Sequence, residues 1–177
     1  AKWASIPVIN ALTDLEHPCQ VLADFMTIRE EFGDFSNVAL TYVGDGNNVA
    51  NSLILCSAIL GLEVKIACPK GYEPNSTIIS KARKINNNEF LKISNNPSEA
   101  VVGANVIYTD VWSSMGEENF KDDKDRDFHG FTVDKNLIDL ADEKSIVLHC
   151  LPAYRGKEIT DEVIDSKNSR IFDQAEN

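Results

Sequence analysis

Short apolar runs and longer amphipathic stretches alternate along the whole chain. The short runs are typical of strands buried on both faces, and they cover residues 38–43, 63–68, 90–93, 106–109, 145–149 and 170–172. The stretches between them have the three- and four-residue spacing of helices, which predicts helices over 18–32, 49–60, 75–86, 134–140 and 161–166 and a helix start at 96–99. We therefore expect an α/β fold of three layers (αβα), Rossmann-like, with a central and mainly parallel sheet.

Three polar loops follow predicted strands directly, at residues 44–48, 110–116 and 149–152. In open parallel sheets, ligands bind beyond the carboxyl ends of the strands, so these loops are the candidate site. The first loop, Gly44-Asp45-Gly46, is similar to a dinucleotide-binding turn, but Val49 stands where the third glycine of that motif belongs. A dinucleotide-binding dehydrogenase domain is therefore the weaker alternative.

Reactive and polar side chains gather in these loops and at the start of the first helix. His17 and Gln20 stand where free N–H groups and the helix dipole favour an anion or a carbonyl oxygen. Asn48 suits an amino-acid carboxylate, and Asp110 suits an ammonium group. Cys150, beside a histidine, is a candidate nucleophile or proton-transfer group. The alternatives at this point are a helix cap for His17, a solvated Gln20, an ordinary loop after Asp110 and an inert buried thiol for Cys150.

Composition narrows the classes of function. The 177 residues include 28 acidic and 17 basic side chains, for a net charge of −11, which argues against binding nucleic acid or an anionic membrane. The four cysteines form no zinc framework and indicate reduced thiols, with Cys56 and Cys68 in the core. No membrane span or secretory signal is visible, so we interpret Asn75 of the sequon Asn75-Ser76-Thr77 as a helix N-cap and expect a cytoplasmic domain without a metal.

Taken in order, the motifs resemble the ornithine-binding domain of the ornithine carbamoyltransferase family. The resemblance rests on Pro7-Val8-Ile9-Asn10, His17-Pro18-Cys19-Gln20, Gly44-Asp45-Gly46-Asn47-Asn48, Asp110 to Gly116, His149-Cys150-Leu151-Pro152 and Phe172 to Asn177. It implies an enzyme that transfers the carbamoyl group of carbamoyl phosphate to the δ-amine of L-ornithine, giving L-citrulline and phosphate. It implies no metal or organic cofactor.

The resemblance also implies roles for individual residues. His17 and Gln20 would contact the carbamoyl group of carbamoyl phosphate and stabilise its oxygen. The side chains that would bind ornithine are Asn48, Asp110, Ser114, Met115, Cys150 and Leu151. The catalytic set would be His17, Gln20, Asp110 and Cys150, in which the cysteine–aspartate pair positions the reacting amine and helps to move protons.

Part of the family's pattern is missing from the 177 residues, namely its phosphate-binding Ser-Thr-Arg-Thr loop. We therefore expect residues 1–177 to form a single ornithine-binding domain that lacks the N-terminal carbamoyl-phosphate domain and the final C-terminal helix. Such a fragment would be inactive and monomeric, and the parent enzyme would be a homotrimer. The charged run 117–127 predicts a segment that orders only with substrates. A non-catalytic amino-acid-binding module of the same fold is a further alternative.

Overall fold

The core of the molecule is a five-stranded parallel sheet, seen in a computed structural model that describes residues 1–86, 88–113 and 121–177. The strands stand in the order β3-β2-β1-β4-β5. Their bounds are β1 Ala39–Val43, β2 Glu63–Ala67, β3 Leu91–Ser94, β4 Val106–Thr109 and β5 Ile146–His149. The chain builds outward from β1 to β3 and then returns to the other side of β1. The gap between the ends of β1 and β4 is therefore the topological switch point, where such sheets bind ligands.

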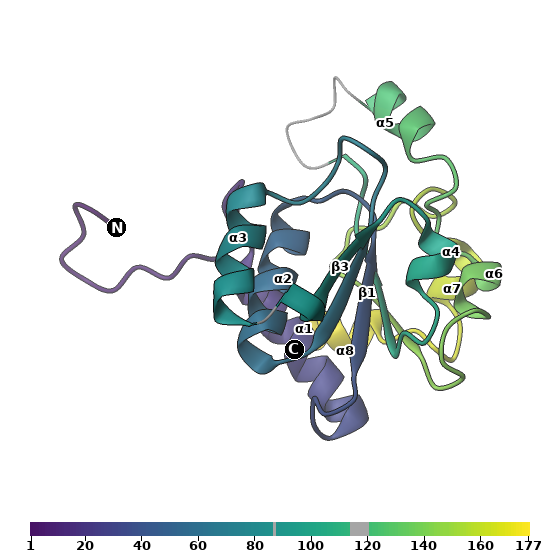
Figure 1. Ribbon diagram of the computed structural model, residues 1–177, viewed down its shortest axis with the longest axis horizontal. Coiled ribbons are helices and arrows are strands. Elements are labelled where there is room, and N and C mark those ends of the chain that lie inside the picture. The colour runs from purple at the N-terminus through teal and green to yellow at the C-terminus, as the bar shows by residue number, and fades with distance from the viewer. Residues whose placement is uncertain (87, 114–120) are drawn as a thin grey trace.

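Helices cover both faces of the sheet (Figure 1). One face carries α1 (Pro18–Phe32), α2 (Asn48–Leu60) and α3 (Ser76–Ile85). The other face carries α4 (Pro97–Ala100), α6 (Lys135–Ile138) and α7 (Asp161–Ile164). α5 (Lys121–Asp127) lies apart from both layers. A short 3-10 turn at Asn88–Phe90 precedes β3. The last helix, α8 (Ile171–Glu176), packs against α1 and β5. The expected three-layer architecture is confirmed, and every strand pair is parallel.

Alternation along the strands divides the interior into two hydrophobic clusters. Tyr42 and Tyr108 point to the α1–α3 side, where their rings stack with centroids 5.8 Å apart. Val43 and Ile107, one residue away along the same strands, point to the opposite cluster. This period of two is what a strand buried on both faces requires, and it brings the Tyr108 hydroxyl to the interior beneath α1.

The expected strand at 170–172 is wrong, because these residues begin helix α8. Only Ser169 pairs with the sheet, through an isolated bridge to Val147, and the chain then turns into a helix that buries Gln174. A three-residue segment with two apolar side chains, Ile171 and Phe172, does not distinguish a short strand from the first turn of a helix.

Smaller differences concern the ends of elements and the cysteines. Helix α2 begins at Asn48, one residue before its expected start, and Asn47 caps it by accepting the N–H groups of Val49 and Ala50. Asn75 caps α3 in the same way, as predicted. Cys68 is buried as expected, whereas Cys56 is only partly buried. None of the helices in the described ranges is both long and apolar enough to cross a membrane.

The first sixteen residues have no regular helix or strand and extend away from the body of the molecule (Figure 1). Their apolar side chains are exposed, with Trp3 at 91% and Ile9 at 82%. The end of this segment is tied to α2, because the Asn51 amide donates to the carbonyl of Leu15. The segment therefore joins the fold beside the carboxyl end of β1.

Candidate active site

Asp110 is the centre of the candidate site, directly after β4 at the switch point. Its side chain is buried, with the residue only 6% exposed. One carboxylate oxygen, Oδ1, accepts the thiol of Cys150 at 3.0 Å and the backbone N–H of Val111 at 2.7 Å. The other, Oδ2, accepts Nδ2 of Asn47 at 2.8 Å. The sequence prediction that Asp110 and Cys150 come together is confirmed by this geometry.

Burial and the neighbouring carboxylate keep the Cys150 thiol protonated. Burial is the main cause that raises the pKa of Cys150 well above its usual value, and the charge and hydrogen bond of Asp110 raise it further. A hydrogen bond from Tyr108 opposes this in part. At neutral pH the pair therefore consists of an S–H donor and a carboxylate acceptor, rather than a free thiolate nucleophile.

His149 does not serve Cys150 as a proton-transfer partner. Its ring is buried, and its Nε2 lies 3.1 Å from Oε1 of Glu158. Its Nδ1 accepts the backbone N–H of Leu151 at 2.8 Å. Donor atoms of Asp110, His149 and Cys150 lie within 4.8 Å of one another, as in a metal site. Because both ring nitrogens are already engaged, this set offers a metal only the carboxylate and the thiol.

His17, at the start of α1, has a partly buried ring with a nitrogen left unsatisfied by the residues that the structure describes. His17 occupies the N-cap position, but its side chain makes no capping hydrogen bond. Its backbone N–H donates to Oγ of Ser52 at 2.7 Å, which fixes the residue against α2. Nδ1 is buried and has no hydrogen-bond partner among the described residues. His17 is thus the N-cap residue by position, as the capping alternative expected, but its side chain does not cap the helix. A buried ring nitrogen without a partner is what a ligand contact would satisfy.

The Gln20 side chain is hydrogen-bonded within the protein rather than solvated. Its Nε2 donates to Oδ1 of Asp24, one turn further along α1, at 2.9 Å. Asp24 is fully buried, and burial raises its pKa to about 7, although hydrogen bonds from Gln20, Gln174 and Tyr108 lower it in part. Asp24 was not among the site residues predicted from the sequence. A charged residue within the apolar stripe of an amphipathic helix was the signal that could have revealed it, because such a residue needs buried partners.

Two further predicted ornithine contacts, Asn48 and Leu151, lie in the loops after β1 and β5 or directly beside them. Asn48 is partly buried at the first turn of α2, and its Nδ2 donates to the carbonyl of Thr13 at 2.8 Å. Leu151 is partly buried, with a φ of 56° in the turn after β5. Ser114 and Met115 lie outside the described residues.

The glycine loop after β1 is shaped by packing rather than by a phosphate. A Cβ on Gly46 would lie 2.3 Å from the backbone nitrogen of Pro74 and 2.6 Å from the carbonyl oxygen of Tyr72. The Gly46 N–H donates to that same carbonyl at 2.9 Å. Glycine is therefore required here so that the 72–74 backbone can approach, which explains the motif without a dinucleotide.

Part of the run that was expected to be mobile is folded as α5 and docked on this loop. Lys124, 7% exposed, forms an ion pair with Asp45, and its ammonium lies 5.8 Å from the centroid of the Tyr72 ring. The Tyr72 hydroxyl donates to Asp127 at 2.9 Å. The expectation for 117–120 lies outside the described residues.

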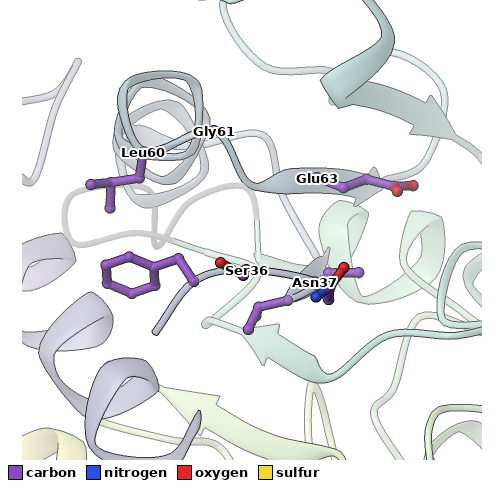
Figure 2. A pocket seen from close by; sticks show the side chains of 8 residues that line it. Ser36, Asn37, Leu60, Gly61 and Glu63 are labelled. Carbon is purple, nitrogen blue, oxygen red and sulfur yellow. The ribbon is translucent and has the colours of Figure 1, made fainter. Parts of the chain in front are cut away.

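A pocket of about 670 Å³ lies at the opposite edge of the sheet (Figure 2). Its walls include Ser36 and Asn37 before β1, and Leu60 and Glu63 around the turn from α2 to β2. These residues stand at the amino ends of the strands, whereas Asp110 and Cys150 follow the carboxyl ends. This pocket therefore does not belong to the candidate site.

Two family models match the chain. Residues 36–177 match the model described as aspartate/ornithine carbamoyltransferase, Asp/Orn binding domain. Residues 1–30, which include His17 and Gln20, match the model described as aspartate/ornithine carbamoyltransferase, carbamoyl-P binding domain. Most of α1 thus falls in the second match, although it packs against α2 and α8.

Curated relatives and solved structures agree with these matches. The ornithine carbamoyltransferase of Prochlorococcus marinus is 70% identical over 178 residues, covering 100% of this chain and 58% of the relative. That of Nostoc sp. is 53% identical, also with 100% and 58% covered. The ornithine carbamoyltransferase structure from Pyrococcus furiosus has a TM-score of 0.93 at 47% identity, covering 99% of this chain and 56% of that one.

The structure of the enzyme from Gloeobacter violaceus gives a TM-score of 0.89 at 46% identity, covering 99% of this chain and 59% of that one. The chain thus spans less than two thirds of the length of these relatives. The matches give no support to the dehydrogenase alternative. With the match over residues 36–177, the chain belongs to the aspartate/ornithine carbamoyltransferase family.

Proposed function

We propose that this chain is the ornithine-binding half of a carbamoyltransferase that converts carbamoyl phosphate and L-ornithine to L-citrulline and phosphate. The observation that carries the proposal is the hydrogen bond of 3.0 Å from the thiol of the partly buried Cys150 to Oδ1 of the buried Asp110 at the switch point. A carboxylate in this place suits an ammonium group, and the thiol beside it gives the pocket a donor of limited reactivity. The names of the relatives, which are 53% to 70% identical, support ornithine as the acceptor.

In the proposed reaction, the neutral δ-amine of ornithine attacks the carbonyl carbon of carbamoyl phosphate. The new C–N bond forms, the C–O bond to phosphate breaks, and the amine loses a proton. Asp110 binds the α-ammonium, while Cys150 and Leu151 form the pocket wall that orients the side chain of ornithine. Asn48 holds the carboxylate with its amide. Ser114 and Met115 complete this set in the proposal.

In the transition state, negative charge develops on the carbonyl oxygen of carbamoyl phosphate. His17 is the group proposed to stabilise it, because its ring has a buried nitrogen with no partner in the described part of the chain. Gln20 lies one turn of α1 away and is fixed by Asp24. These residues position the carbamoyl group and stabilise the developing charge. The reaction as proposed uses no metal or organic cofactor.

The same proposal covers the organisation of the protein. Residues 1–177 form one ornithine-binding unit, which lacks the phosphate-binding loop and is inactive and monomeric by itself, while the parent enzyme is a cytoplasmic homotrimer. The packing of α1 against α2 and α8 supports a single unit. Four free cysteines, two of them partly buried, one buried and one exposed, support a reducing compartment.

The test is a chimera in which this chain replaces the matching 58% of the Prochlorococcus marinus relative. We expect the chimera to form citrulline from carbamoyl phosphate and ornithine, and the isolated chain to form none. Aspartate in place of ornithine is the control acceptor. Carbamoyl-aspartate formation at a comparable rate, or no product from a folded chimera, would refute the proposed function.

A further inference from the structure

A single carboxylate oxygen beneath the candidate site receives two side-chain amides from distant parts of the chain. Oδ1 of Asp24 accepts Nε2 of Gln20 at 2.9 Å and Nε2 of Gln174 at 2.6 Å. Asp24 and Gln174 are 0% and 1% exposed, so solvent does not compete for these hydrogen bonds. In the function proposed above Asp24 only fixes Gln20, yet its placement also determines which end of the Gln20 amide can meet a substrate.

The orientation of the Gln20 amide follows from the chemistry of its partner. Oδ1 of Asp24 accepts hydrogen bonds whether the carboxyl group is ionised or carries its proton on Oδ2, which has no hydrogen-bond partner among the described residues. The NH₂ group of Gln20 therefore faces Asp24 in either state. The carbonyl oxygen Oε1 then lies at the other terminus of the amide, away from this hydrogen bond. Gln20 therefore offers a ligand chiefly a hydrogen-bond acceptor, whereas an unrestrained glutamine could turn either end toward it.

A carbamoyl group has two different ends, an NH₂ donor and a carbonyl acceptor. We propose that Asp24 is a positioning residue that orients Gln20 so that Gln20 Oε1 accepts the NH₂ of the carbamoyl group. This inference rests on the proposed function. The carbonyl oxygen of the substrate is then left to His17, and an acyl phosphate with a methyl group in place of NH₂ leaves Oε1 without a partner. Asp24 thus contributes to the choice of carbamoyl over acyl phosphates.

The same network reaches the ornithine end of the site. Nε2 of Gln174 also lies 3.1 Å from the Tyr108 hydroxyl, and its Oε1 accepts the backbone N–H of His149 at 2.8 Å. His149 directly precedes Cys150. Because Gln174 is itself oriented by Asp24, one buried carboxylate fixes the amide beneath the carbamoyl group and the strand end that carries the thiol.

The first experiment compares carbamoyl phosphate with acetyl phosphate in the chimera described above. The readout is the ratio between the inhibition constant of acetyl phosphate and the KM of carbamoyl phosphate. In Asp24→Leu the acceptor is gone and the Gln20 amide can turn, so we expect this ratio to fall about 5- to 10-fold, the equivalent of one hydrogen bond. In Asp24→Asn, Oδ1 still accepts both amides, so the ratio should stay within about 2-fold of wild type.

Thr27→Val is the matched control, because Thr27 is a buried polar residue one turn further along α1 whose hydroxyl bonds to the carbonyl of Ala23. It should leave the ratio unchanged. A purely structural role for Asp24 would weaken both ligands equally, so an unchanged ratio in an active Asp24→Leu chimera would overturn the inference. An equal fall in Asp24→Asn and Asp24→Leu would overturn it as well. A wild-type chimera that forms no citrulline would instead refute the proposed function.

The second experiment needs neither activity nor a stable Asp24→Leu variant. In the ¹⁵N-labelled wild-type chain, the side-chain amide resonances of Gln20, assigned with Gln20→Met, should move as Asp24 titrates across neutral pH. In the described part of the chain, the other titratable groups that interact with Asp24 are Asp110, Tyr108, Cys56 and Cys150. Asp110→Asn identifies any contribution from that neighbour. Gln20 resonances that shift at no pH at which the chain stays folded would show that Nε2 does not face Asp24, and the inference would fail.

Discussion

Asn47 and Asp110 are joined by a hydrogen bond of 2.8 Å from the amide Nδ2 to the carboxylate Oδ2. The carbonyl oxygen of the same amide accepts the N–H groups of Val49 and Ala50 at the start of α2. The helix start thus determines which end of the amide faces Asp110, and Asp110 is fixed in turn. A helix cap and the orientation of a candidate catalytic carboxylate depend on one side chain.

Asn47→Ala should therefore have two effects. Loss of the cap should lower the free energy of unfolding by about 1–2 kcal/mol. Loss of the hydrogen bond should also free the Asp110 carboxylate and weaken ornithine binding to the chimera about 10-fold. Urea unfolding of the chain and the ornithine KM of the chimera measure the two effects. Asn75→Ala is the matched control, since Asn75 caps α3 without contacting Asp110. Equal effects of both variants on KM would contradict the prediction.

The Cys150 thiol should alkylate slowly at neutral pH, because burial and the charge of Asp110 raise its pKa well above the usual value. Asp110→Asn removes the charge, lowers the pKa of Cys150 and should increase the rate of reaction with iodoacetamide about 10-fold. Mass spectrometry of the labelled peptides measures this, and the exposed Cys19 in the same sample is the internal reference. A Cys150 rate that does not change relative to Cys19 would show that Asp110 does not control the thiol.

Asp24 should make the chain less stable as the pH rises. Its folded-state pKa is raised from 3.8 to about 7, so the native state holds this proton where the unfolded chain has lost it. Stability is therefore highest below the unfolded pKa and declines until the pH passes the folded pKa.

Asp24→Asn removes this titration. Its free energy of unfolding, relative to wild type, should increase between about pH 4 and about pH 7 by up to roughly 4 kcal/mol and then level off. Urea titrations at a series of pH values measure the difference. If the two proteins differ by the same amount at every pH, Asp24 does not titrate as described.

α5 should detach from the glycine loop when Lys124 loses its charge. Lys124 pairs with Asp45 in a buried setting, and breaking such a pair costs about 3–5 kcal/mol. In Lys124→Met, the amides of 121–127 should exchange with deuterium faster than in wild type. Lys135→Met is the control, because Lys135 and Asp139 form an exposed pair worth about 0.3–0.5 kcal/mol. Unchanged exchange in α5 would show that other contacts hold it.

The sequence was sufficient to locate the five strands and to place Asp110 and Cys150 at strand ends, because both depend on local patterns, whereas the expected sixth strand was wrong. Strands buried on both faces are continuous apolar runs, and Asp110 and Cys150 directly follow two of them. The partnership of Asp24 with Gln174 could not be predicted, since the two residues are 150 positions apart and only the packing of α8 on α1 brings them together. The same contact explains the missed helix at 171–176, where a buried glutamine interrupts an apolar pattern.

The N-terminal segment ends at the mouth of the site, where the Asn48 amide donates to the carbonyl of Thr13 at 2.8 Å. Asn48 is also the residue proposed to hold the carboxylate of ornithine. The backbone of the segment and the amino acid would therefore share the two protons of a single NH₂ group. A change in the path of residues 1–12 would shift the Thr13 carbonyl and turn this amide with it. The course of the backbone ahead of α1 would then alter the affinity for ornithine.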